Sequence, residues 1–370
     1  MPQAKQVLLC ALSAALLHGG RVELSQSEVF RSGQDGYHTY RIPALITTSR
    51  GTLLAFVEGR RQSRSDSGDI DLLLKRSFDR GKTWSKAQVI ADLGADTIGN
   101  PAPVVDRRSG GIILLLTRNP GEVTEKQIID SAVETTRTVW ISRSADDGAT
   151  WTPPVEITAS VKEPEWTWYA TGPGAGIQLE SGRLVIPCDH IVKGSKARHS
   201  HVIYSDDRGK SWKIGGIADE KTNESAVAEL RDGSLLLNMR SYQGDNRRRI
   251  AISRDAGLTF SKAEPDPALI EPVCQASLIR AVRPGKKSDG RLLFSNPAAL
   301  KRVRMTVRLS PDDGKTWPVS RVLHEGPAAY SSLAVLNDGT IGILYERGEH
   351  DSYEQITFAR FPLAWLSERR

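Results

Sequence analysis

An octapeptide that occurs five times is the feature that most constrains the fold of this chain. Its pattern is S-x-D-x-G-x-[ST]-[WF], and the copies occupy residues 77–84, 144–151, 205–212, 253–260 and 310–317. Their first residues lie 67, 61, 48 and 57 positions apart, about 58 on average. A repeat of this length gives roughly six units in residues 21–370, one of which lacks the octapeptide, here called the box.

The residue types of the box are those of a tight turn. Its Asp hydrogen-bonds to nearby backbone, its Gly permits a positive φ, and its Trp or Phe anchors the turn in a core. Strand-like segments rich in β-branched residues precede the boxes. These segments are residues 70–75, 138–142, 201–204, 250–253 and 306–309. Further strands are expected after turn signals, at residues 53–58, 112–117, 184–187, 235–239 and 341–346.

Short strands and one hairpin box per unit predict an all-β chain, a six-bladed β-propeller of four-stranded antiparallel blades with the boxes as turns. The box itself has no expected catalytic role, because an active site needs one copy and the box has five. The 370 residues fit one such domain. A charged fraction of 25% with 39% hydrophobic residues excludes a disordered chain and a multi-span membrane protein.

The basic residues are mostly arginine, with 34 Arg against 16 Lys and a net charge of +6. The net charge is only a weak indication of an acidic partner. The arginine excess is more informative, because a guanidinium group binds a carboxylate through two parallel hydrogen bonds. The run Arg247-Arg248-Arg249 follows turn residues and lacks interleaved aromatics. We therefore expect a solvated hairpin tip there and no nucleic-acid contact.

The N-terminus carries an apolar run at residues 7–17, too short to span a bilayer. It predicts a signal peptide over residues 1–20, which leaves residues 21–370 for the propeller domain, and a secreted or periplasmic protein without stable membrane insertion. The alternative is a buried N-terminal helix. Cys10 lies within the run, and Cys188 and Cys274 are expected to be small buried residues. The cysteines and histidines show no metal-ligand spacing.

The motif Tyr40-Arg41-Ile42-Pro43, followed by the five boxes, resembles the start of the exo-α-sialidases (neuraminidases) of the bacterial and lysosomal type, glycoside hydrolase family 33. The resemblance extends over residues 30–360. It implies a propeller that removes terminal α-linked sialic acids, with no metal or organic cofactor.

The resemblance implies that three arginines from different blades hold the carboxylate of the sugar. Arg41 matches the first and Arg240 the second. Arg302, eight residues before the fifth box, matches the third, with Arg304 as the alternative because the strand period of two would aim it similarly. Glu346 matches a late glutamate that pairs with the first arginine. Planar guanidinium groups suit this task because they fix the orientation of a carboxylate.

A general acid is implied by the loop before the first box. Asp66 matches the acid of the family, and either Arg60 or Arg61 would face the sugar. Asp69 and Asp71 are the alternatives to Asp66. A carboxyl group must be protonated to help the leaving oxygen depart, so we expect a semi-closed loop that raises its pKa.

Tyr330 matches the nucleophile of the family, and Glu224 matches its base. Glu229 is the alternative base, but the turn that follows it suggests a surface position at the end of a strand. Sialidases depart from two-carboxylate hydrolysis in using a tyrosine. The physical reason is that a neutral phenol avoids the repulsion that a carboxylate nucleophile would meet at an anomeric carbon bearing another carboxylate.

Two further segments, residues 100–103 and 166–174, are expected to shape the pocket. The sequence thus predicts a retaining exo-α-sialidase acting on sialylated glycoproteins, glycolipids and oligosaccharides. The alternatives are a trans-sialidase, which transfers the sugar to another sugar, and a non-catalytic glycan-binding propeller.

Overall fold

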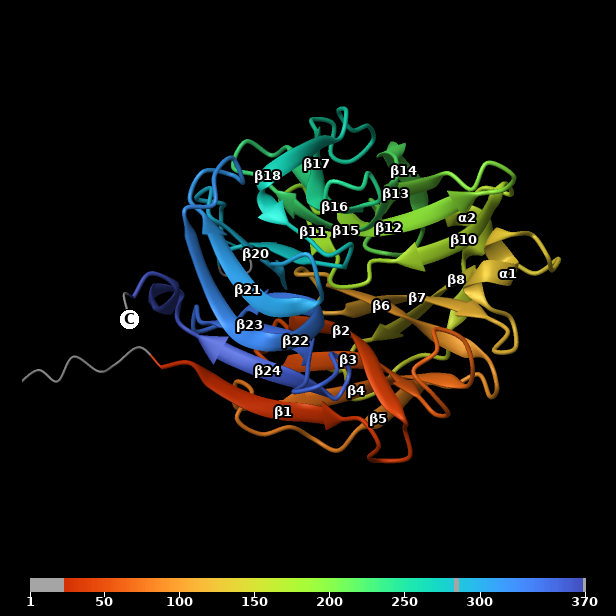
Figure 1. Cartoon of the computed structure of the whole chain (residues 1–370), viewed down its shortest axis with the longest axis horizontal. Helices are drawn as coiled ribbons and strands as arrows, with labels where there is room; N and C mark the ends of the chain where they lie inside the picture. Colours follow the sequence, from red (N-terminus) through yellow and green to blue (C-terminus); the bar gives the residue numbers. More distant parts are fainter. Residues whose placement is uncertain (1–22, 283–285, 369–370) are drawn as a thin grey trace, which may run out of the picture.

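The computed structural model describes residues 23–282 and 286–368 and is all-β, as predicted (Figure 1). The expected signal peptide at residues 1–20 lies outside the described residues. The helices are short: α1 (Glu125–Ile129), α2 (Thr158–Val161) and the 3₁₀ turn η1 (Leu363–Leu366). No helix in the described ranges is long and apolar enough to cross a membrane.

The strands pair into four sheets of seven, five, four and eight strands. The eight-stranded sheet divides where β4 and β6 share a single parallel pair, and the seven-stranded sheet divides within the long strand β22, which gives six antiparallel groups. The first group holds β2 (Thr39–Thr47), β3 (Leu53–Arg60), β4 (Ile70–Ser77) and β5 (Gln88–Ala91). The second holds β6 (Thr97–Val105), β7 (Ile112–Asn119), β8 (Thr138–Ser144) and β9 (Val155–Glu156). The third holds β10 (Trp166–Thr171), β11 (Ile177–Gln178), β12 (Leu184–Val192), β13 (Arg198–Ser205) and β14 (Lys213–Glu220).

The fourth group holds β15 (Thr222–Glu229), β16 (Leu235–Ser241), β17 (Arg247–Ser253) and β18 (Glu264–Ile270). The fifth holds β19 (Ser277–Arg280), β20 (Leu292–Pro297), β21 (Val303–Ser310) and the first part of β22 (Val319–Val335). The sixth holds the end of β22, β23 (Ile341–Arg347), β24 (Gln355–Phe361) and β1 (Ser25–Arg31). The expected strands before the boxes and after the turn signals are all confirmed.

Each box is a turn between the last two strands of its group, as expected. In the first box, the Asp79 carboxylate accepts hydrogen bonds from the Ser77 hydroxyl at 2.9 Å and from the backbone N–H and hydroxyl of Thr83 at 2.9 and 2.6 Å. The Gly81 N–H donates to the Ser77 hydroxyl at 2.8 Å. The sixth group has no box because its adjacent strands β24 and β1 come from opposite ends of the chain.

The glycine of the box also allows close packing between neighbouring groups of strands. Gly81 has a φ of +83°, and a Cβ on it would lie 2.0 Å from the ring of Phe358 in the sixth group. A Cβ on Gly148 of the second group would lie 3.0 Å from Leu54 of the first. Each box therefore abuts the group before it, and glycine is needed both for the turn and for the close approach.

The hydrophobic core consists of clusters between consecutive groups. One cluster joins Phe56 of β3 to Leu114 of β7, and another joins Leu344 of β23 to Leu53 of β3. The N-terminal strand β1 pairs with β24 from Ser25 opposite Arg360 to Arg31 opposite Gln355. Figure 1 shows the red strand β1 beside the blue strand β24. The sixth group is thus completed by the first strand of the chain.

The structure corrects one expectation and confirms another about single residues. Arg248 is fully buried at the start of β17, where it pairs with Glu271 at 2.7 Å and hydrogen-bonds to Asn238. The run Arg247-Arg248-Arg249 is therefore not a solvated hairpin tip, because strand alternation turns its middle residue into the core. Cys188 and Cys274 are free and buried, as predicted.

Candidate active site

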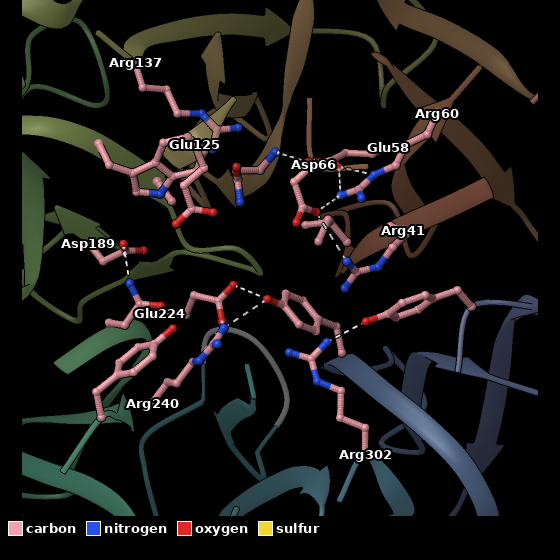
Figure 2. Close-up of a pocket in the computed structure, with 18 residues that line it drawn as sticks. Arg41, Glu58, Arg60, Asp66, Glu125, Arg137, Asp189, Glu224, Arg240 and Arg302 are labelled. Carbon is pink, nitrogen blue, oxygen red and sulfur yellow. Dashed lines mark hydrogen bonds and ion pairs between the residues drawn. The ribbon is translucent and has the colours of Figure 1, made fainter. Parts of the chain in front are cut away.

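One pocket brings together most of the side chains singled out in the sequence (Figure 2). They come from different groups of strands and from the loop between β3 and β4. The predicted residues that line it are Arg41, Arg60, Asp66, Glu224, Arg240, Arg302 and Tyr330. Residues that are far apart in the sequence therefore lie together in one pocket.

Tyr330 and Glu224 form the closest polar contact of the pocket. The Tyr330 hydroxyl donates to Glu224 Oε1 at 2.5 Å, and the other carboxylate oxygen accepts from Arg240 Nη1 at 2.7 Å. Burial raises the pKa of Tyr330 well above its usual value, and the Glu224 charge raises it further. The phenol is therefore neutral, with a carboxylate in place to take its proton.

Glu346 lies behind the pocket, fully buried at the end of β23. Its carboxylate accepts from Arg41 Nε at 3.1 Å and from the backbone N–H groups of Ile42 and Tyr330, both at 2.9 Å. One side chain thereby fixes the position of Arg41 and the backbone that carries Tyr330. The Arg41 guanidinium also stacks over the Tyr353 ring, 4.0 Å from its centroid.

Arg302, and not Arg304, faces the pocket. Arg302 lies just before β21 and donates to the Tyr353 hydroxyl at 2.6 Å. Arg304 has a φ of +63° at an irregularity in the pairing of β21 with β22, and its side chain is 53% exposed beside Glu325. The strand period that suggested equal orientation fails because Arg302 precedes the strand and the register shifts at Arg304, between Val303 and Met305.

Asp66 lies on the loop between β3 and β4, with its side chain 60% exposed. It pairs with Arg60 at 2.7 Å and with Arg41 at 3.5 Å. Partial burial alone would raise the pKa of this carboxyl, but the charges of Arg60 and then Arg41 outweigh burial and lower it. The expected raised pKa of Asp66 is therefore wrong.

The other sequence candidates lie outside the pocket. Arg61 points away and pairs with Asp71 at 2.6 Å and Asp69 at 3.2 Å, so the neighbouring Arg60 is the arginine beside Asp66. Asp71 is fully buried and accepts from Tyr37. Glu229 is also buried, where it accepts the Glu180 N–H, so its expected surface position is wrong.

The two segments expected to shape the pocket contribute in part. Asn100, with a φ of +51°, lines the pocket, and its backbone N–H donates to Glu58 at 2.9 Å. From residues 166–174, Trp168 and Ala170 line the pocket. Trp166 instead stacks on His190, with 3.6 Å between ring centroids.

Several lining residues were not predicted from the sequence. These are Ile42, Glu58, Glu125, Arg137, Asp189, Asn223, Tyr242 and Tyr353. Ile42, Asn223 and Tyr242 lie within two residues of a predicted site residue, which was a usable signal. Arg137 and Asp189 follow no motif, and only the packing of the groups brings them to the pocket. In the described part of the chain no cluster of His, Cys, Asp and Glu is arranged to hold a metal ion.

Comparison with known proteins first identifies the class of protein. The family model of the BNR repeat-like domain matches residues 51–343, so the chain is a BNR-repeat protein. Curated relatives include a sialidase of Micromonospora viridifaciens, 35% identical over 94% of this chain, and a sialidase of Bacteroides fragilis, 36% identical over 86%. The chain belongs to the sialidase family, as the resemblance in its motifs implied.

Among solved structures, the Hadza microbial sialidase Hz136 is 34% identical, with a TM-score of 0.83 over 92% of this chain and 69% of that one. The chain spans 55% of the Micromonospora sialidase and 62% of the Bacteroides sialidase. These relatives thus carry sequence beyond the region that they share with this chain.

Proposed function

We propose that this protein is a retaining exo-α-sialidase built as a six-bladed β-propeller. Support for the propeller comes from the order of contacts among the inner strands. β2 contacts β6, β6 contacts β10, β15 contacts β12 and β19, and β22 contacts both β19 and β2. Core clusters between consecutive groups and the pairing of β1 with β24 agree with a closed ring of six blades.

Arg41, Arg240 and Arg302, called the arginine clamp below, bind the carboxylate of a terminal sialic acid. Two of them already lie beside the Tyr330 ring, at 4.9 Å for Arg41 and 5.7 Å for Arg302 from the ring centroid. The third, Arg240, lies 3.4 Å from the Tyr330 hydroxyl. A carboxylate held by these groups would place the attached anomeric carbon near the phenol oxygen.

The single observation that carries the proposal is the 2.5 Å hydrogen bond from Tyr330 to Glu224 beside the arginine clamp. Glu224 takes the phenol proton while the phenol oxygen attacks the anomeric carbon. Asp66 gives its proton to the departing glycosidic oxygen, and a covalent sialyl–tyrosine ketal remains. Asp66 then takes a proton from water, whose oxygen displaces Tyr330, and the phenolate recovers its proton from Glu224.

The lowered pKa of Asp66 fits this sequence of steps. Burial and the Arg60 and Arg41 charges set that pKa. A bound carboxylate would engage Arg41 and draw its charge away from Asp66, and a bound sugar would exclude water. Both changes raise the pKa of Asp66, so the acid is generated when substrate binds.

The test is turnover of a fluorogenic α-sialoside by the purified protein, Tyr330→Phe, and the matched control Tyr345→Phe. Tyr345 is buried in β23, and its hydroxyl contacts Gln26 away from the pocket. We expect kcat/KM to fall on the order of 10³-fold or more in Tyr330→Phe and to change little in the control. Equal turnover by wild type and Tyr330→Phe would exclude Tyr330 as the nucleophile.

Two further measurements separate the alternatives. Proton NMR of the first product should show the same anomer as the substrate, since two displacements at one carbon retain configuration. Adding a galactoside acceptor distinguishes a transferase, which would divert the sugar from water to the acceptor. A folded wild type that turns over no α-sialoside would leave the non-catalytic glycan-binding propeller.

We also propose that residues 1–20 are a cleaved signal peptide and that the protein is secreted or periplasmic. The supporting observation is the apolar run at residues 7–17. N-terminal sequencing of protein recovered from outside the cytoplasm should begin near residue 21. An intact Met1 in recovered, active protein would contradict the proposal.

A further inference from the structure

A buried ion pair behind the pocket, Arg248 with Glu271, has no task in the mechanism proposed above. Arg248 lies on β17 and Glu271 directly follows β18. Both side chains are fully buried, with 2.7 Å between Arg248 Nη1 and Glu271 Oε2, and neither is among the residues that line the pocket. A buried pair of this kind gains little stability over apolar residues of similar volume, because both charges lose their water. Its other contacts indicate a different role.

The pair holds the backbone on both sides of Arg240, the second arginine of the clamp. Before Arg240, the Asn238 side-chain oxygen accepts from Arg248 Nε at 2.7 Å, and the Asn238 carbonyl accepts from Nη2 at 3.3 Å. After Arg240, the Ser241 N–H donates to Glu271 Oε1 at 2.7 Å. Two charged side chains thus fix the end of β16 from which Arg240 reaches the pocket.

Arg240 depends on its backbone more than Arg41 does. The Arg41 guanidinium is bound by Glu346, a carboxylate that moves no proton in the proposed mechanism. Arg240 is bound through Nη1 to Glu224, the proposed base, and its Nε is buried without a hydrogen-bond partner in the described part of the chain. Glu224 loses its charge when it takes the phenol proton. From that step on, the backbone has to keep Arg240 in place.

The pair also fixes the segment 271–275, here called the strap, which connects β18 to β19. Arg248 Nη1 donates to the Cys274 carbonyl at 2.8 Å. The preceding residue, Val273, has a φ of +54°, a conformation that a β-branched residue adopts only where its surroundings impose it. Backbone strain of this kind is concentrated at functional sites. The strap is thus held in an unfavourable conformation beside the pair.

The other end of the strap holds the backbone next to the nucleophile. Gln275 is 2% exposed, and its side-chain amide binds both backbone groups of Ser331. The Ser331 N–H donates to Gln275 Oε1 and the Ser331 carbonyl accepts from Gln275 Nε2, both at 3.0 Å. Ser331 directly follows Tyr330. The strap therefore connects the backbone of Tyr330 to that of Arg240 behind the pocket.

We propose that Arg248 and Glu271 are positioning residues that keep Arg240 aligned with the carboxylate of the substrate while Glu224 changes its charge. This rests on the proposed sialidase function. Neither residue touches the substrate, and both act through the backbone of β16 and the strap. An arginine suits this task because its planar group presents several N–H donors in a fixed geometry, whereas a lysine offers one flexible ammonium group.

The experiment measures how strongly the pocket prefers a carboxylate. The probes are a free sialic acid and its uncharged C1 amide, each used as a competitive inhibitor of α-sialoside hydrolysis. The ratio of the two Ki values reports the alignment of the arginine clamp and is independent of the fraction of protein that is folded. We expect wild type to prefer the acid by about 100-fold, because the guanidinium groups bind it through charge-assisted hydrogen bonds.

Two variants remove the contacts of the pair. Arg248→Lys keeps the charge but loses the fixed fork, so the preference for the acid should fall by about tenfold, the effect of misplacing one charge-assisted hydrogen bond. The double variant Arg248→Met/Glu271→Leu removes both buried charges. It should unfold at no lower temperature than Arg248→Lys and still lose the preference at least as far, which a merely stabilising role would not produce.

The matched control is Arg360→Lys. Arg360 also binds a carboxylate and a further oxygen, those of Asp338 at 2.7 Å and Thr340 at 2.9 Å, but it lies outside the pocket. Its ratio of Ki values should equal that of wild type. A ratio that falls equally in Arg360→Lys would assign the effect to the loss of any partly buried arginine and would overturn the positioning role.

The outcomes separate this inference from the proposed function. If wild type hydrolyses the α-sialoside and the folded Arg248 variants keep its ratio, the positioning role is overturned and the sialidase proposal stands. Hydrolysis without any preference for the acid overturns the arginine clamp and this inference with it. A folded wild type that hydrolyses no α-sialoside overturns both proposals. If neither Arg248 variant folds, the ratio in Asn238→Ala decides, since that variant removes a single acceptor from Arg248.

Discussion

At the scale of single residues, the site depends on carboxylates that each hold several partners in place. Glu346 is the clearest case, since it binds Arg41 and the backbone N–H groups of Ile42 and Tyr330. Glu224 similarly bridges Tyr330 and Arg240. Residues from three groups of strands are thereby fixed relative to one another before any substrate arrives.

Glu346→Gln tests this positioning role. The amide NH₂ would face N–H groups that now donate to a carboxylate, and Arg41 would lose its buried counter-charge. We expect the free energy of unfolding to fall by about 3 kcal/mol and kcat/KM on an α-sialoside to fall with it. Urea denaturation measures the first effect and the fluorogenic assay the second.

The matched control is Glu325→Gln. Glu325 also pairs with an arginine, Arg304, at 3.3 Å, but both side chains are largely exposed. Its loss should cost less than about 1 kcal/mol because water screens such pairs. Similar losses in the two variants would contradict the positioning role of Glu346.

The sequence could identify the site residues that sit in recognisable motifs, and it left open only choices that depend on local geometry. Arg60 and Arg61 are adjacent, so strand alternation sends one to the pocket and the other to Asp71. Arg302 and Arg304 differ because Arg302 precedes β21 and the register of β21 shifts at Arg304. Arg137 and Asp189 could not be predicted, because contacts between groups place them and no nearby motif marks them.

At the scale of elements, the box explains how the strands were predictable. Its hydrogen bonds are local, between residues at most four apart, so the sequence alone specifies the turn. The inner strands β6, β10 and β19 were not predicted. Their residues line the pocket or pack between groups. Polar and apolar residues therefore do not alternate along them as they do along a half-buried strand.

Gly81→Ala tests the packing role of the box against its turn role. The control is Gly33→Ala, since Gly33 has nearly the same φ, +82°, but nothing within 4 Å of the added Cβ. Both variants carry the backbone strain of an alanine at positive φ. Only Gly81→Ala also forces a methyl into Phe358, so its thermal midpoint should fall further. Equal thermal midpoints would show that the contact between Gly81 and the sixth group contributes nothing to stability.

A second prediction at this scale concerns the buried histidines of β12 and β13. His190 and His201 approach through their Nδ1 atoms at 3.1 Å, and His201 also contacts Tyr169. Burial lowers the pKa of His190 to about 3, with His199 and Lys162 adding to the effect. The unfolded chain, with an ordinary histidine pKa near 6.5, binds more protons below that pH, so the free energy of unfolding falls as the pH drops from about 6.5 toward 3.

His190→Phe should keep the stacking on Trp166 and lose part of this pH dependence. The measurement is the difference in urea midpoint between pH 7.5 and pH 4.5, which should be smaller in His190→Phe than in wild type. The same substitution at the exposed His350 is the control and should leave the difference unchanged. An unchanged difference in His190→Phe would contradict the buried neutral state of His190.

At the scale of the whole molecule, the proposed ring of blades is completed by one short strand from the N-terminal side. β1 supplies the outer strand of the sixth group, whereas in every other group the strands are consecutive in the chain. This closure was not predictable strand by strand, because the repeat length fixes how many units there are but not how the two ends meet. We therefore expect β1 to contribute to the stability of the whole domain.

Phe30→Ala tests this closure. Phe30 is 2% exposed in β1, packs against Tyr40 with 5.0 Å between ring centroids, and lies under the Lys75 ammonium group. Deleting its ring removes buried contacts and weakens the attachment of β1, so the free energy of unfolding should fall by about 3–5 kcal/mol in a single transition. Phe78→Ala, the same substitution at a side chain that is 68% exposed, should change it by less than about 0.5 kcal/mol. A Phe30→Ala protein as stable as Phe78→Ala would mean that the ring holds without its first strand.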